Sequence, residues 1–166
     1  MLKDKKIEDF KKIVDKAGNL LIKKNSTIAI AESVTSGNLQ AVFSLAENAT
    51  MFFQGGITVY NIGQKCRHLL VEPTHAIECN CVSKRISDQM AVQVCHLFSA
   101  KYGIGITGYA SPVPEQNIHK LFGYVSIAKS NRVVLSKKIN AQISEPREVQ
   151  LFYTEQVIKS LISALK

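Results

Sequence analysis

The chain has no tryptophan, and aromatic residues make up only 7% of its 166 positions. It also lacks any apolar run near the roughly 20 residues of a membrane-spanning helix, and residues 1–6 lack the apolar stretch of a secretory signal. Its four cysteines are too few and too loosely spaced for a disulfide framework. The composition therefore predicts a cytoplasmic globular protein with free thiols and one sizeable core.

Neither nucleic acid nor metal is the ligand that this sequence favours. The net charge of +8 is compatible with nucleic acid, but much of it comes from N-terminal lysines that alternate with apolar residues at helical spacing. Such a pattern is typical of a solvated helix face, and no recognised RNA-binding motif accompanies it. His75, Cys79 and Cys81 lie close together, yet the Cys-x-Cys spacing differs from the paired Cys-x2-Cys of zinc sites. An anionic small molecule remains compatible with the positive charge.

The order of apolar patterns predicts an α/β fold. Helices are expected over 2–24, 36–46, 61–70, 83–100 and 146–165, and strands over 27–31, 55–60, 102–107, 122–128 and 133–139. The last two strands form a hairpin around Ser130-Asn131, which makes the sheet mixed rather than purely parallel. We therefore expect a single three-layer α/β/α domain with a mixed central sheet over residues 1–166, with the N-terminal helix 2–24 packed on it.

A run of small polar residues, 32–37, follows the first expected strand and points to a ligand site. Ligands of open α/β sheets bind at the carboxyl edge of the strands, and the helix that follows would aim unpaired backbone N–H groups at the same place. A second loop of small residues, 108–112, follows the third strand, so the two loops are predicted to lie side by side. The alternative is that Ser33, Thr35 or Ser36 only caps the helix.

Three further side chains are candidates for the same edge. Tyr60 ends an expected strand and Lys65 lies about one helical turn into the next element, so both can reach back over the sheet. A Ser-Lys pair is a known nucleophile arrangement, but the lysine needs a lowered pKa, and a solvated surface lysine is the alternative. Arg147 begins the last helix, where it either holds a phosphate or forms a surface ion pair with a neighbouring glutamate.

These residues also match a known family. Residues 31–37, Ala-Glu-Ser-Val-Thr-Ser-Gly, resemble the Ala-Glu-Ser-Cys-Thr-Gly-Gly motif of the CinA C-terminal domain family, the nicotinamide mononucleotide (NMN) amidohydrolases. The likeness covers nearly the whole chain in the family's order. It continues in Phe52-Phe53-Gln54-Gly55-Gly56 with Tyr60 and Lys65, in Val82-Ser83 to Met90-Ala91, in Thr107-Gly108-Tyr109-Ala110-Ser111-Pro112, and in Arg147.

The resemblance implies a hydrolase without metal or cofactor that converts NMN to nicotinate mononucleotide and ammonia. Ser33 would attack the amide carbon, Lys65 would accept its proton and later donate one to ammonia, and Tyr60 would bridge or orient the pair. The family tends to dimerise, so a homodimer is expected. The resemblance assigns substrate binding to Thr35, Ser36 and Gly37, whose amides would face the oxyanion, and to Thr107, Gly108 and Arg147, which would grip ribose or phosphate.

Several positions on the expected rim depart from the family pattern. Val34 replaces a cysteine, Ser36 and Ser111 replace glycines, and residues 113–117 replace a glycine-rich loop. If position 36 needs a positive φ, a serine there costs on the order of 1 kcal/mol. The substitutions motivate a second hypothesis, a homologue that binds a nucleotide and has lost turnover.

Overall fold

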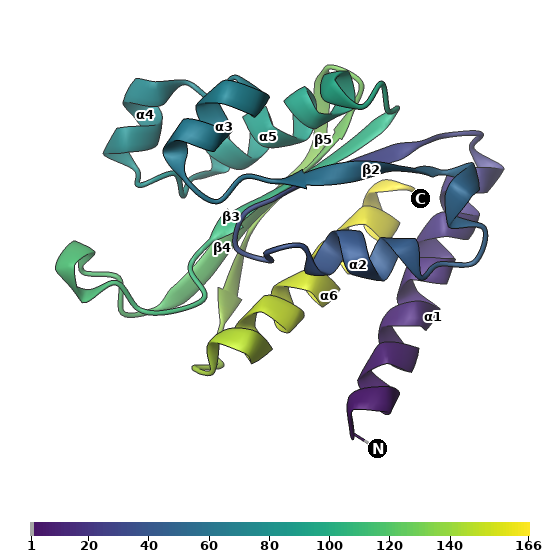
Figure 1. Cartoon of the computed structure of the whole chain (residues 1–166), viewed down its shortest axis with the longest axis horizontal. Helices are drawn as coiled ribbons and strands as arrows, with labels where there is room; N and C mark the ends of the chain where they lie inside the picture. The colour runs from purple at the N-terminus through teal and green to yellow at the C-terminus, as the bar shows by residue number, and fades with distance from the viewer. Residues whose placement is uncertain (1) are drawn as a thin grey trace.

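Five strands form one mixed sheet in the order β2-β1-β3-β4-β5 (Figure 1). The computed structural model describes the backbone of residues 2–166 and the side chains of residues 8–166. β1 runs parallel to β2 and β3, whereas β4 is antiparallel to both β3 and β5, as the predicted hairpin requires. The strands are β1 (Ile28–Glu32), β2 (Phe53–Thr58), β3 (Tyr102–Gly108), β4 (Leu121–Lys129) and β5 (Arg132–Ala141).

Helices cover both faces of this sheet, which confirms the predicted three layers. One face carries α1, α2 and α6, and the other carries α3, α4 and α5 (Figure 1). None of the described helices has the length and apolar character needed to cross a membrane. The helices are α1 (Leu2–Lys23), α2 (Asn38–Ser44), α3 (Ile62–Leu69), α4 (Pro73–Glu78), α5 (Lys84–Leu97) and α6 (Pro146–Ala164), with 3-10 turns at Ala49–Met51 and Pro114–Gln116.

Local capping explains where several helices begin. The Asn61 side chain accepts a hydrogen bond from the Gln64 amide at 3.1 Å, and the Ser83 hydroxyl accepts one from the Ile86 amide at 3.2 Å. Both caps start helices where the sequence predicts them. In contrast, α2 starts two residues later than expected, because residues 36 and 37 have φ values of 50° and 90° and cannot be helical.

The central strands are buried on both faces, and glycine permits close packing on one of them. Every residue of β1 is buried, which fits the alanines and isoleucines that precede its last residue, Glu32. In β3, a Cβ atom added at Gly105 would lie 2.3 Å from the backbone oxygen of Ser87 in α5. The absence of a side chain at this position therefore lets α5 lie directly on the sheet.

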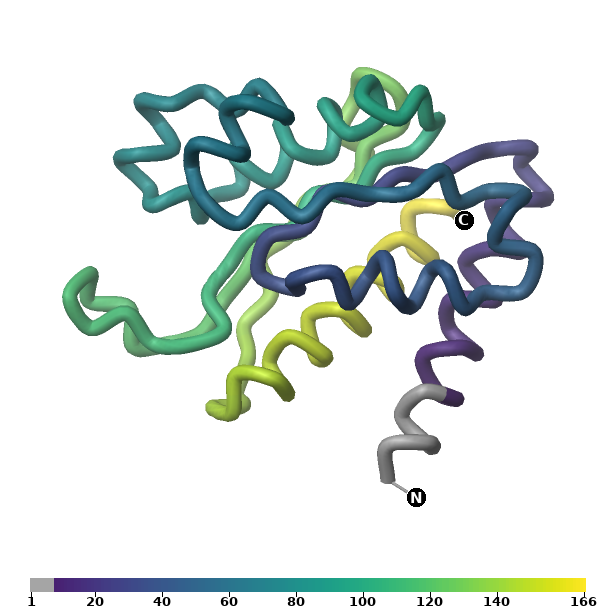
Figure 2. Tube along the Cα trace, viewed as in Figure 1, coloured from purple at the N-terminus to yellow at the C-terminus, as the bar shows by residue number. Residues whose placement is uncertain are grey.

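The carboxyl ends of β1, β2 and β3 meet at one edge of the sheet, because the three strands are mutually parallel. Beyond β3, residues 109–120 extend away from the sheet before the chain returns as β4 (Figure 2). We call these residues the arm. The loops after β1 and β3 thus lie side by side, as the sequence predicts, and the arm projects next to them.

Candidate active site

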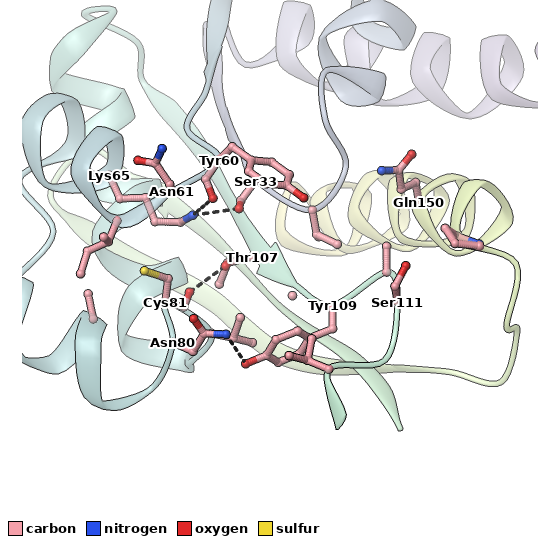
Figure 3. Close-up of a pocket in the computed structure, with 18 of the residues that line it drawn as sticks. Ser33, Tyr60, Asn61, Lys65, Asn80, Cys81, Thr107, Tyr109, Ser111 and Gln150 are labelled. Atoms are coloured by element: carbon pink, nitrogen blue, oxygen red, sulfur yellow. Dashed lines mark hydrogen bonds between the residues drawn. The ribbon is translucent and has the colours of Figure 1, made fainter. Parts of the chain in front are cut away.

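A cavity of about 670 Å³ opens at this edge of the sheet (Figure 3). The loops after all three parallel strands contribute to its wall, and α3, the turn after α4, and α6 complete it. Its lining includes Ser33 and Val34 after β1, Tyr60 and Asn61 after β2, Thr107 to Ser111 at the end of β3 and just beyond it, Asn80 and Cys81 from the turn after α4, and Lys65 and Gln150 from α3 and α6.

Ser33 and Lys65 meet in this cavity. The Lys65 Nζ atom lies 2.9 Å from the Ser33 Oγ atom, 2.9 Å from the Val59 carbonyl oxygen and 3.1 Å from the Tyr60 carbonyl oxygen. Only 1% of the lysine is exposed. The alternative of a solvated surface lysine does not apply to position 65, and Figure 3 shows the amine directed at the serine.

Burial lowers the pKa of the Lys65 amine, because a charged ammonium is poorly solvated there. Among residues 8–166, no carboxylate pairs with it to restore the charge. A neutral amine has two N–H donors and one lone pair, and the site offers two carbonyl acceptors and one hydroxyl donor. When the amine is neutral, its lone pair can accept the Ser33 proton across this 2.9 Å contact, which is the geometry that activates a serine nucleophile.

Two thiols near the lysine act in the opposite direction. Negative charge on Cys81 or Cys66 would raise the pKa of Lys65 and favour its ammonium form. Burial, however, raises the pKa of the Cys81 thiol, so that this side chain stays neutral at ordinary pH. A neutral Cys81 therefore adds no negative charge to offset the effect of burial on the pKa of Lys65.

The fully buried Glu32 carboxylate organises the loop that carries Ser33. It accepts hydrogen bonds from the Thr35 hydroxyl at 2.6 Å and from the backbone amides of Gly37, Leu39 and Gln40 at 2.8 to 3.1 Å. The Gln40 side chain adds a further bond at 3.1 Å. The N-terminus of α2 is thus capped by a carboxylate, and the Gly37 amide bonds to Glu32 instead of facing the cavity as the resemblance implies.

Two backbone N–H groups next to Ser33 remain available as hydrogen-bond donors. No acceptor among residues 8–166 pairs with the backbone N–H of Val34 or Thr35. Ser36 has the positive φ expected for the family's glycine, and its hydroxyl lies 3.5 Å from the Gln150 side-chain nitrogen. The amides of Val34 and Thr35 are therefore available as donors beside Ser33, whereas the Gly37 amide already bonds to Glu32.

The remaining predicted residues contribute mainly through the backbone or at the rim. The Tyr60 carbonyl orients Lys65, while its side chain is 75% exposed at the mouth. The buried Thr107 hydroxyl donates to the Cys81 carbonyl at 2.7 Å, which ties β3 to the turn after α4. At Gly108, an added Cβ would lie 2.6 Å from the Gly123 Cα, so this glycine permits the pairing of β3 with β4.

Arg147 lies at the rim rather than in the wall of the cavity. Its neighbour Pro146 lines the cavity, but its own guanidinium is exposed and donates to the Asn38 Oδ1 atom at 2.6 Å. The Glu145 carboxylate accepts from the backbone amides of Arg147 and Glu148 instead of pairing with the guanidinium. The alternative of a surface ion pair between Arg147 and Glu145 is therefore absent from the described contacts.

Sequence reasoning missed the wall formed by the arm and the turn after α4. The Asn80 side-chain nitrogen donates to the Tyr109 hydroxyl at 3.3 Å and to the Gln116 side-chain oxygen at 2.6 Å. Asn80 and Cys81 both have left-handed φ values, 48° and 59°. Asn80 is a local signal for this turn, because asparagine tolerates the left-handed conformation. Its contacts with the arm depend on tertiary structure and have no local signal.

Comparisons with known proteins agree with this fold. The model of the CinA C-terminal domain family matches residues 10–165. A CinA-like protein of Picosynechococcus is 35% identical over 111 residues, which is 67% of this chain and 26% of the relative, and one of Prochlorococcus marinus is 33% identical over 76% of this chain and 28% of the relative. The chain thus spans about a quarter of the length of these curated relatives.

Solved structures show the same architecture. A CinA superfamily protein from Klebsiella pneumoniae has a TM-score of 0.84 at 19% identity, covering 94% of this chain and 97% of its own. One from Enterobacter cloacae has a TM-score of 0.82 at 22% identity, covering 95% and 92%. These likenesses concern the fold, while the family model spans almost every described residue. The chain belongs to the CinA C-terminal domain family.

Proposed function

We propose that this protein is an amidohydrolase that converts NMN to nicotinate mononucleotide and ammonia through a Ser33-Lys65 pair. One observation carries the proposal. The Lys65 amine is buried, has no carboxylate partner among residues 8–166, and is held 2.9 Å from the Ser33 hydroxyl by two backbone carbonyls. This arrangement suits a lysine that acts as a general base.

The reaction proceeds through an acyl-enzyme ester. Lys65 takes the Ser33 proton as Oγ attacks the amide carbon, and the backbone N–H groups of Val34 and Thr35 are the available donors for the oxyanion. The resulting ammonium returns the proton to the departing nitrogen, which leaves as ammonia. Water then attacks the ester with Lys65 as base, releasing the carboxylate product and restoring the Ser33 hydroxyl.

Arg147 is the proposed partner of the substrate phosphate. Its guanidinium lies beside the cavity rim, and no carboxylate among residues 8–166 lies within 4.0 Å of it. An unpaired guanidinium has donors left for two phosphate oxygens. The net charge of +8 also favours an anionic substrate over a neutral one.

A second candidate is a nucleotide-binding homologue without turnover. It is favoured by Ser36, whose side chain occupies the rim between α2 and α6 opposite Gln150, where the family has a glycine. Such a protein would bind NMN in the same cavity and leave its amide intact.

Ammonia release from NMN separates the two candidates. The hydrolase is expected to release ammonia with wild-type protein and to lose it with Ser33→Ala, while calorimetry shows that both proteins still bind NMN. Binding without ammonia release by wild type would support the second candidate. Equal ammonia release by wild type and the Ser33→Ala variant would remove Ser33 from the nucleophile role.

A further inference from the structure

Asn38, the first residue of α2, connects the loop that carries Ser33 to Arg147 of α6. Its side-chain nitrogen donates to the Thr35 carbonyl oxygen, and its Oδ1 atom accepts from the Arg147 guanidinium at 2.6 Å. The two bonds require opposite ends of the amide, so the orientation of the side chain is determined by its neighbours. No other residue in the described contacts bonds to both the loop and this arginine.

The hydrogen bond from Arg147 to Asn38 leaves the positive charge of the guanidinium without a paired negative charge. Asn38 is a neutral acceptor, so it orients the guanidinium without neutralising it. The adjacent Glu145 carboxylate is occupied by the backbone amides of Arg147 and Glu148. An aspartate at position 38 would accept from the arginine as an ion pair, and it would have no donor for the Thr35 carbonyl.

We propose that Asn38 is a positioning residue that holds Arg147 beside the cavity, fully charged, for the phosphate of the substrate. This proposal rests on the proposed function for its substrate, but its geometry concerns anion binding and is testable without turnover. It implies that Asn38 helps the protein to prefer a phosphorylated pyridine nucleoside over an unphosphorylated one. The Asn38 side chain would do so without touching the substrate amide or Ser33.

The test compares Asn38→Asp, Asn38→Ala and a control, Asn131→Asp, which adds the same charge to the exposed turn between β4 and β5. The readout is the ratio of kcat/KM for NMN to that for nicotinamide riboside. Asn38→Asp is expected to lower this ratio about fivefold, the scale of a surface ion pair, with riboside turnover nearly unchanged. Asn38→Ala should lower it less, and the control should leave it unchanged.

Two outcomes would overturn the proposal. One is an unchanged ratio in Asn38→Asp. The other is an equal loss for both substrates, which would mean that Asn38 merely supports the serine loop.

If wild type releases no ammonia, the proposed function fails but this inference is still tested by binding of nicotinate mononucleotide in calorimetry. Weaker binding by Asn38→Asp than by wild type and the control would support it. Equal binding by all three, or no binding by wild type, would refute it.

Discussion

Replacing Lys65 with methionine removes the proposed base while keeping a long apolar stem in the same buried position. Loss of a general base should lower the rate of the proposed NMN hydrolysis by about 10²–10⁴, or about 3–5 kcal/mol of transition-state free energy. The Ser33→Ala variant should lose activity to a similar extent. Because the two side chains act as a unit, the double variant should be no slower than the slower single one.

The same substitution changes how stability depends on pH. Burial lowers the pKa of Lys65 in the folded protein below its ordinary value of 10.5, so the unfolded chain binds the proton more tightly. The free energy of unfolding of wild type should therefore rise with pH between the lowered folded pKa and 10.5. The Lys65→Met variant lacks this rise, because it has no amine to titrate.

Urea unfolding at several pH values and ammonia release measure the two effects on the same proteins. Lys159→Met, on the exposed side of α6, is the control and should shift stability by no more than about 0.5 kcal/mol. The activity of wild type should rise with pH as Lys65 loses its proton. A Lys65→Met variant that keeps a tenth or more of wild-type turnover, or the same pH slope of stability as wild type, would refute the role of this amine.

Three other predictions concern the structure around the site. Glu32→Ala leaves several α2 amides without an acceptor and should cost about 3 kcal/mol or more in urea unfolding, whereas loss of less than about 1 kcal/mol would contradict the capping role. Gly105→Ala places a Cβ 2.3 Å from the Ser87 carbonyl oxygen and should destabilise by about 1–3 kcal/mol, seen as a lower Tm; an unchanged Tm would argue against the close approach of α5. Burial raises the pKa of Cys95 to about 11, so iodoacetamide should leave this thiol unmodified in native protein at about pH 8 and label it after denaturation, with mass spectrometry as the readout.

Elements defined by local signals could be predicted from the sequence. Apolar spacing predicts a helix over 146–165 and α6 spans Pro146–Ala164, while Asn61 and Ser83 cap helices because a cap needs only the next three residues. The start of α2 could not be predicted in this way. The helix begins only at residue 38, because residues 36 and 37 are left-handed. The Gly37 amide donates to the Glu32 carboxylate at the end of β1.

Contacts within the site depend on tertiary structure to different degrees. The parallel order of the strands, together with the family resemblance, was enough to predict that Ser33 and Lys65 share a sheet edge. The role of Glu32 as a cap was not predictable, because it depends on the position of α2 relative to the end of β1. The position of Arg147 at the rim likewise depends on Asn38, which no local pattern connects to a residue in α6.

Strand geometry explains how the buried Glu32 carboxylate can adjoin Ser33, the partner of the buried Lys65, without forming an ion pair with the lysine. Successive side chains of a strand point to opposite faces of the sheet. Glu32, the last residue of β1, therefore turns toward α2, where backbone amides satisfy it. Ser33, directly after the strand, turns toward α3, where it meets Lys65. Were the carboxylate on the lysine's side, an ion pair would raise the pKa of the amine and favour its protonated form, which cannot act as the proposed base. The alternation at the end of β1 thus separates the carboxylate that holds the loop from the amine that we propose as the base.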